Sequence, residues 1–402
     1  MQIVWQCLCL VVVWILRLSG FVSEAAIPHR YLNTHQLIVK YGYPAETHTV
    51  TTEDGYILTM HRIPYSPKSN STDTKRPVVF LQHGLTGSSA DWVILGPNKS
   101  VCYMLADKGY DIWLGNSRGN KYSKKHTTLS TKSSKFWDFS WHEMGIYDLP
   151  SMIDYVLNRT SHHNLHYIGI SMGTTMFFVC TSMKPEYNRK IHLMIALAPT
   201  AFMANSKTPL HKLNLMNKTT LRFLSSLKIN AVRRSKFMDF IAEKVCTDEK
   251  ARIICSYIIF ELFGYDYKQL NESLLPVMFS LIPAGASWKS FVHYFQEMIT
   301  DSGKFLQYDY ENLNMAKYRQ PTPPEYNLQA VTAPVALFYG SNDPFADPTD
   351  VLKLNNTLPN VVELYRVPWD QFNHIDFIVA NDVNPLINDH IIYLMKRFKT
   401  LT

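Results

Sequence analysis

Six short runs of apolar residues, each bounded by turn-forming residues, restrict the fold of this chain more than any other feature. Their apolar character is continuous rather than alternating, which predicts strands buried on both faces of a sheet. Segments with helical patterns separate them, which favours a mostly parallel sheet of the α/β class. The runs are Val78–Gln82, Asp111–Leu114, Leu165–Ile168, His192–Ala198, Pro334–Tyr339 and Val361–Val367.

The regular alternation fails between about residues 200 and 325, where helical patterns dominate. Ser235 is a candidate N-cap for a helix over residues 235–246, and Arg252–Phe263 is apolar nearly all round before it ends at a glycine. Ala286–Met298 continues in the same style. We therefore expect helices inserted into an α/β core, with a separate helical domain as the alternative.

An apolar run over residues 3–16 has the length of a signal-peptide core and is too short for a confident membrane span. Small residues follow it, so cleavage is expected near Ala25 or Ala26. Lys and Arg are absent before the run, which keeps an uncleaved anchor as the alternative. No later segment has enough uninterrupted apolar length to span a bilayer, so we expect no transmembrane span in the mature chain.

A secreted chain is expected to carry glycans and disulfides. Four cysteines remain after removal of the signal, and they allow three complete pairings. Cys180 lies in the apolar run MFFVC and is expected to be a buried thiol. The four cysteines are Cys102, Cys180, Cys246 and Cys255, and the six glycosylation sequons begin at Asn70, Asn98, Asn158, Asn217, Asn271 and Asn355.

The composition excludes several classes of protein. Hydrophobic residues make up 46% and charged residues 18% of the 402 residues, which excludes a disordered chain, a collagen or a coiled coil. The net charge of +7 is spread along the chain and lacks the dense basic stripe of a nucleic-acid-binding protein. No cysteine and histidine cluster has zinc-ligand spacing. We therefore expect no nucleic-acid partner, no metal and no cofactor.

The pattern G-x-S-x-G occurs twice, at residues 115–119 and 169–173, and context separates the two copies. A nucleophile elbow needs a strand before it and a helix after it, with small residues where a Cβ would clash. The apolar stretch TTMFFVC after Ser171 fits a buried helix, whereas residues 120–126 after Ser117 are polar and show no helical face. Ser171 is therefore the predicted nucleophile, and the copy around Ser117 is predicted to be a structural turn.

A serine hydroxyl needs a base to take its proton and a third group to orient that base. In the α/β-hydrolase arrangement, acid and histidine follow the serine in that order. Asp343 comes at the end of the run Pro334–Tyr339, with Asp347 and Asp350 as rivals that are more typical of a helix start. His374 follows the last predicted strand on a loop, whereas His390 lies within a helical pattern. We predict Asp343 as the acid and His374 as the base.

Two backbone N–H groups are expected to stabilise the oxyanion of the tetrahedral intermediate. One normally belongs to the residue after the nucleophile, here Met172, and the other to the loop after an early strand. That loop is residues 83–87, and Leu85 is the candidate donor. His83 in the same loop is expected to order the loop rather than to act as a base.

At the level of longer motifs, the chain resembles the acid lipase family of the α/β-hydrolase superfamily. The resemblance covers nearly the whole mature chain. It is carried by YGYPAETHTVTTEDGYIL (41–58), LQHGLTGSSADW (81–92), LADKGYDIWLGNSRGN (105–120), FWDFSWHEMGIYDLP (136–150), LHYIGISMGTT (165–175), TPPEYN (322–327), GSNDPFADPTDV (340–351) and FNHIDF (372–377).

The resemblance implies an α/β-hydrolase core with an inserted helical cap and lid. The expected parts are a signal peptide over 1–26, core over 27–200, cap and lid over 201–325, and the remaining core over 326–402. The resemblance also implies the triad and oxyanion donors named above and a cap disulfide between Cys246 and Cys255. One departure concerns the residues beside the nucleophile. The family usually has His before it and often Gln after it, whereas this chain has Ile170 and Met172.

Together these features predict a secreted serine lipase that hydrolyses ester bonds of neutral lipids, triacylglycerols or cholesteryl esters, at a lipid–water interface. A soluble carboxylesterase and a non-catalytic lipid carrier are the alternatives, and the lysosome is the alternative destination. Three cations, Arg233, Arg234 and Lys236, begin the helix over 235–246. We expect them to be solvated, with contact to anionic lipid head groups as the alternative.

Overall fold

The computed structural model describes residues 32–69, 75–209, 217–227, 229–299 and 303–398. The predicted signal peptide and the sequon at Asn70 lie outside these ranges. Of the other sequons, Asn98, Asn158 and Asn217 are exposed, whereas Asn271 and Asn355 are partly buried.

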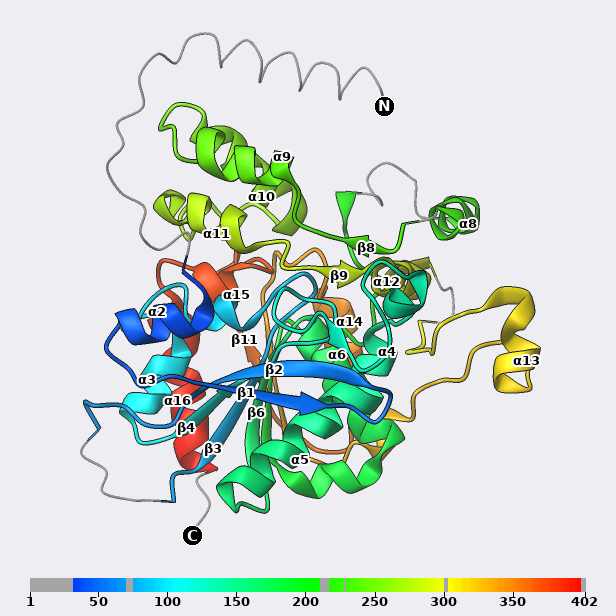
Figure 1. The fold of residues 1–402 in the computed structure, drawn as a ribbon, viewed down its shortest axis with the longest axis horizontal. Coiled ribbons are helices and arrows are strands. Elements are labelled where there is room, and N and C mark those ends of the chain that lie inside the picture. Colours follow the sequence, from blue (N-terminus) through cyan, green and yellow to red (C-terminus); the bar gives the residue numbers. More distant parts are fainter. Residues whose placement is uncertain (1–31, 70–74, 210–216, 228, 300–302, 399–402) are drawn as a thin grey trace.

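A nine-stranded sheet forms the centre of the described chain, in the order β1-β2-β4-β3-β6-β7-β10-β11, with β5 paired to β2 (Figure 1). Strands β4 to β11 in this order are all parallel, whereas β1 and β5 pair antiparallel with β2, and β2 with β4. The strands are β1 Glu46–Thr51, β2 Tyr56–Ile63, β3 Val78–Gln82, β4 Asp111–Leu114, β5 Lys125–His126, β6 Leu165–Ile170, β7 Ile191–Leu197, β10 Val335–Tyr339 and β11 Val361–Arg366.

All six predicted strands are present; Val78–Gln82 and Asp111–Leu114 have the predicted bounds, and the other four have one or both ends shifted by one or two residues. The prediction of burial on both faces is correct for β3, β4, β6 and β10, whose residues are all buried, but wrong for β11. Strand β11 lies at the edge of the sheet, and all its residues are at least partly exposed. Its apolar side chains therefore cover the sheet edge rather than fill its centre.

Helices cover both faces of the sheet. In Figure 1, α3 (Val101–Asp107) and α16 (Asp389–Arg397) lie on one side, and α5 (Leu149–Thr160) lies on the other. Helix α6 (Met172–Met183) follows β6 directly and is buried along almost its whole length, as predicted from its apolar sequence. The other core helices are α2 Thr34–Lys40, α4 Trp141–Glu143, α14 Pro348–Thr357 and α15 Asp376–Val379.

The helices between residues 217 and 318 lie largely beyond one end of the sheet, where α9, α10 and α11 stand together at the top of Figure 1. Ser235 caps α9 as predicted, because its side chain accepts the Met238 N–H. The helix predicted from Ala286 begins at Trp288, since Ala286–Ser287 form β9, which pairs with β8 (Ala231–Val232). These helices are α8 Lys218–Ser226, α9 Lys236–Phe240, which continues through Ile241–Val245, α10 Arg252–Phe263, α11 Leu275–Leu281, α12 Trp288–Ile299 and α13 Asn314–Tyr318.

A disulfide joins Cys246 to Cys255, with the two Cα atoms 5.8 Å apart. Cys102 and Cys180 are free and buried, so the predicted buried thiol at Cys180 is confirmed. Within the described ranges, no helix is both long enough and apolar enough to cross a membrane.

Candidate active site

Ser171 lies in a sharp turn between β6 and α6, with φ 51° and ψ −119°. This is the strained strand-to-helix geometry that a nucleophile elbow requires, with glycine on either side. A Cβ on Gly173 would lie 2.4 Å from the carbonyl oxygen of Gln82, and one on Gly169 would lie 2.9 Å from the carbonyl carbon of Gly173. The Ser171 N–H donates to the Leu197 carbonyl at 3.0 Å, which ties the turn to the end of β7.

Asp343 and His374 are brought together from the ends of β10 and β11. His374 Nδ1 lies 2.8 Å from Asp343 Oδ2 and 3.0 Å from Oδ1, and both residues are buried. Asp343 Oδ1 also accepts the N–H groups of Phe345 at 2.8 Å and Ala346 at 2.9 Å. A carboxylate held in this way accepts a hydrogen bond from Nδ1–H, which keeps the proton on Nδ1 and leaves Nε2 as the acceptor of the imidazole.

The two rival carboxylates have other partners. Asp347 is the N-cap of α14 and accepts the Thr349 N–H, and it forms an ion pair with Lys207 at 2.7 Å. Asp350 accepts the backbone N–H of Asn205 at 2.9 Å and its side-chain amide at 2.8 Å. Both therefore have the helix-start and turn roles that their sequence context indicates.

The loop after β3 approaches the nucleophile closely. A Cβ on Gly84 would lie 3.2 Å from Ser171 Cβ, so Leu85 follows at the edge of the elbow. His83 Nδ1 contacts the Gly84 carbonyl at 2.7 Å, and its Nε2 accepts the Ser117 N–H at 3.1 Å. Burial lowers the pKa of His83 to about 4. A neutral His83 therefore orders this loop, with Nδ1–H as donor and Nε2 as acceptor.

The second G-x-S-x-G copy forms a buried turn that supports this loop. The Ser117 hydroxyl accepts a hydrogen bond from Gln82 Nε2 at 2.9 Å. Arg118 is 1% exposed and pairs with Asp148 at 2.7 Å and with Asp54 at 2.6 Å. The next helix element begins only near residue 134, so the turn lacks the strand-to-helix geometry of an elbow.

A cavity of about 520 Å³ opens beside the elbow, and Leu85, Ile170, Ser171 and His374 all line it. Such a volume suits a small-molecule or lipid ligand. Its remaining walls come mostly from apolar side chains of the helical segment. These include Met238, Ile258, Ile259, Leu262, Phe263, Met278, Phe279, Phe291, Phe295 and Met298.

The end of α10 is joined to the loops that carry Asp343 and His374, a connection that the sequence did not predict. The His374 N–H donates to the Phe263 carbonyl at 3.3 Å, and Asn373 Nδ2 donates to the Gly264 carbonyl at 2.8 Å. Gly264 has φ 102°, and a Cβ there would lie 2.5 Å from the Asn342 carbonyl oxygen. A glycine after the apolar helix was visible in the sequence, but its partner residues lie more than 70 positions away.

In the part of the chain that the structure describes, no group of three or more His, Cys, Asp or Glu side chains is arranged to hold a metal ion.

The family models match over most of the chain. The α/β hydrolase fold model matches residues 77–380, and the partial α/β-hydrolase lipase region matches residues 34–96.

Curated relatives match along almost the whole length. Rat gastric triacylglycerol lipase (Rattus norvegicus) is 40% identical over 92% of this chain and 92% of its own. Human lipase member K (Homo sapiens) is 38% identical over 98% and 99%, and lipase 1 of Drosophila melanogaster is 44% identical over 89% and 78%. The chain belongs to the acid lipase family. It is a carboxylic ester hydrolase with the α/β-hydrolase fold, so the predictions of family, fold and enzyme class are confirmed.

Solved structures show the same fold in more distant proteins. A thermophilic esterase from Thermogutta terrifontis has a TM-score of 0.52 at 14% identity, over 88% of this acid lipase and 100% of that chain. A peroxisomal α/β-hydrolase from Saccharomyces cerevisiae has a TM-score of 0.53 at 14% identity, over 90% and 91%. At this identity the likeness concerns the fold alone.

Proposed function

We propose that this acid lipase hydrolyses ester bonds of neutral lipids, triacylglycerols or cholesteryl esters, through an acyl-enzyme on Ser171. The observation that carries the proposal is the apolar cavity of about 520 Å³ that contains both Ser171 and His374 in its wall. An acyl chain buried there loses its contact with water, which stabilises binding by about 0.8 kcal/mol for each buried CH₂ group. The gastric relatives are named as triacylglycerol lipases, which supports the same substrate class.

The proposed mechanism has two steps. His374 Nε2 takes the hydroxyl proton while Ser171 Oγ attacks the ester carbonyl, and the backbone N–H groups of Leu85 and Met172 stabilise the oxyanion. The C–O bond of the ester then breaks, and the alcohol leaves with the proton from His374. In the second step, water takes the place of the alcohol: His374 takes a proton from the water as it attacks the acyl carbon, and Ser171 Oγ then leaves and regains its proton. Asp343 orients the imidazole through Nδ1 and stabilises its charged form.

We propose that residues 201–325 act as the cap and lid of this site, between core segments 27–200 and 326–402. Several apolar side chains of α9, α10 and the following loop are exposed, and they offer a surface for a lipid–water interface. They are Phe237, Ile253, Tyr257, Leu262, Tyr265 and Tyr267.

Two of the three cations at the start of α9, all of which were expected to be solvated, have partners within the protein. Arg234 pairs with Asp239 and donates to the Phe279 carbonyl at 2.7 Å, and Arg233 donates to the Thr131 carbonyl at 3.0 Å. Both guanidinium groups are therefore engaged within the protein. We propose apolar rather than charged contact as the main attraction to lipid.

We further propose that the protein is secreted, with the lysosome as the alternative destination, because residues 3–16 have the pattern of a signal-peptide core. The Cys246–Cys255 disulfide supports an oxidising compartment. The sequons remain candidate glycosylation sites.

The test is fatty-acid release from emulsified long-chain triacylglycerol and from a soluble short-chain ester, measured side by side on purified protein. We expect release from the emulsion, its loss in Ser171→Ala, and its retention in Ser117→Ala. Activity on the soluble ester alone would support a carboxylesterase. Absence of both activities in folded protein would support the lipid carrier.

A further inference from the structure

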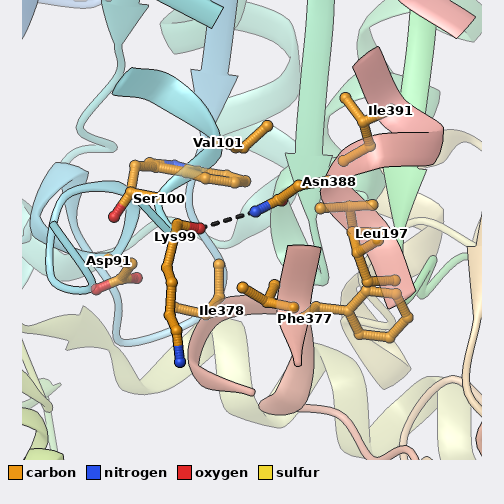
Figure 2. A pocket seen from close by; sticks show the side chains of 12 residues that line it. Asp91, Lys99, Ser100, Val101, Leu197, Phe377, Ile378, Asn388 and Ile391 are labelled. Carbon is orange, nitrogen blue, oxygen red and sulfur yellow. Dashed lines mark hydrogen bonds between the residues drawn. The ribbon is translucent and has the colours of Figure 1, made fainter. Parts of the chain in front are cut away.

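A second, much smaller cavity lies between the short helix η1 (Ser89–Trp92), the start of α3 and helices α15 and α16 (Figure 2). Helix η1 follows the loop of residues 83–87, which we call the oxyanion loop. Its volume is about 10 Å³, measured as the space open to the centre of a water molecule. One water requires roughly 10–15 Å³ on this measure. The cavity is therefore matched to a single water rather than to an organic ligand.

Two buried polar atoms of its wall have no hydrogen-bond partner within the described residues. They are the indole Nε1–H of Trp92, a residue 3% exposed, and the hydroxyl of Ser100, a residue 6% exposed. Buried donors without partners are costly, and in proteins they are commonly satisfied by an ordered water. Ser100 precedes α3 as its N-cap residue, yet its side chain makes no capping hydrogen bond, so the hydroxyl is available to the cavity.

Asp91 supplies a third polar group at the same place. Figure 2 shows its carboxyl on the same side of the cavity as Ser100. Asp91 Oδ2 accepts the Ser88 N–H at 3.2 Å, which holds the carboxyl in position. Burial raises the pKa of this carboxyl to about 7, so near neutral pH it both accepts and donates hydrogen bonds. An indole N–H, a hydroxyl and a carboxyl are together the three partners that a buried water typically has.

The small cavity adjoins the catalytic centre. Asp91 and Ile378 line both this cavity and the large substrate cavity. Leu197, which also lines the small cavity, accepts the Ser171 N–H at 3.0 Å, and Ile378 lies one turn after His374. The small cavity thus adjoins the large cavity that Ser171 and His374 line.

From this arrangement we infer that Trp92, Ser100 and Asp91 hold one water molecule and supply it to the acyl-enzyme for hydrolysis. The inference rests on the acyl-enzyme of the proposed function. A long acyl chain fills the apolar cavity and shuts out bulk water from that side, so a separate polar entry beside the oxyanion loop solves a real problem of the second step.

The step supplied by this water is balanced. The water oxygen bonds to the acyl carbon while His374 Nε2 takes one water proton. The tetrahedral intermediate then collapses, the bond from carbon to Ser171 Oγ breaks, and Oγ takes the proton back from His374. The product is one carboxylic acid, and the enzyme returns to its starting state. A further water refills the site past Asp91.

The test measures how the acyl-enzyme divides between water and an added alcohol, n-butanol, with a long-chain p-nitrophenyl ester, whose acyl group fills the large cavity, as acyl donor. Fatty acid and butyl ester are quantified in the same reaction. Butanol is too large for the small cavity of about 10 Å³ and must enter where the alcohol of the ester leaves, so the variants should change only the supply of water. In Ser100→Ala and Trp92→Phe we expect the ratio of acid to butyl ester to fall about fivefold each, the effect of one net hydrogen bond.

Ser290→Ala is the matched control, because its buried hydroxyl also has no hydrogen-bond partner among the described residues but lines neither cavity. Its ratio should equal that of the wild type. An unchanged ratio in both folded Ser100→Ala and Trp92→Phe overturns the water-supply role. If the wild type forms no butyl ester, the acyl-enzyme itself is refuted, which separates that failure from failure of the water site.

Discussion

Replacement of Asp343 by Asn tests the proposed triad, because it changes the hydrogen bond between the Asp343 side chain and His374 Nδ1. Asp343 Oδ1 accepts two backbone N–H groups, from Phe345 at 2.8 Å and from Ala346 at 2.9 Å. The amide oxygen of Asn is the only one of its two terminal atoms that can accept them. It therefore takes the Oδ1 position, and the NH₂ group takes the Oδ2 position, 2.8 Å from His374 Nδ1.

An amide donor at that position reverses the tautomer of the imidazole. His374 Nδ1 must then accept, so the proton moves to Nε2, the nitrogen that takes the serine proton in the proposed mechanism. The base can no longer take the Ser171 proton, and the imidazolium loses its counter-charge. We expect kcat to fall about 10³–10⁴-fold, or about 4–5.5 kcal/mol in the activation free energy, with little change in KM.

The assay is hydrolysis of a soluble p-nitrophenyl ester under saturating conditions, with thermal unfolding measured on the same preparations. Asp347→Asn is the matched control, because Asn is also a good N-cap for α14 and only an ion pair with a largely exposed lysine is lost. It should keep kcat within about twofold. A large loss in Asp347→Asn together with near-normal activity in folded Asp343→Asn would refute the assignment of the acid.

Three further predictions concern stability and the elbow. Burial raises the pKa of Asp376, and the neighbouring Asp266 carboxyl raises this pKa further. Because the folded state then binds more protons than the unfolded chain, the free energy of unfolding falls as the pH rises above about 4. Asp266→Asn should add about 1–2 kcal/mol at pH 7 and almost nothing at pH 4 in chemical denaturation, and an equal gain at both pH values would contradict this reasoning. Loss of the Cys246–Cys255 disulfide in a double serine variant should cost about 2–3 kcal/mol, read as a lower denaturation midpoint, since the link closes a short loop. Gly173→Ala should lower kcat at least about 100-fold, because its Cβ would meet backbone atoms that cannot move aside, and wild-type kcat would show that the turn is not strained.

The parts of the fold that sequence reasoning recovered are those with strong local signals. Strands β3, β4, β6 and β10 are uninterrupted apolar runs, and burial on both faces requires such runs. Strand β1 was not predicted, because its residues alternate between partly buried and exposed and include Glu, Thr and His. It is an edge strand, and its place is set by antiparallel pairing with β2 rather than by its own apolarity.

In the candidate site, too, features with a local sequence signal could be predicted, whereas features that depend on distant contacts could not. Ser171, Asp343 and His374 each follow a predicted strand, so their convergence at one edge of the sheet could be expected from topology alone. The role of the turn around Ser117 could not, because it depends on the contact of Ser117 N–H with His83 Nε2, 34 positions apart in the chain. From the sequence it was possible to predict only that the G-x-S-x-G copy around Ser117 is a structural turn.

The end of α10 in the helical segment is connected directly to His374, the proposed base. Phe263 stacks parallel to the His374 ring at 6.3 Å between centroids, and its carbonyl accepts the His374 N–H. Phe263 and Leu262 also line the substrate cavity, while Leu262 is 44% exposed at the surface. A single turn of α10 thus reaches the surface, lines the large cavity and contacts His374. If the helical segment acts as the proposed lid, we expect displacement of α10 by a lipid surface to move the loop that carries His374, which would couple opening of the cavity to alignment of the base.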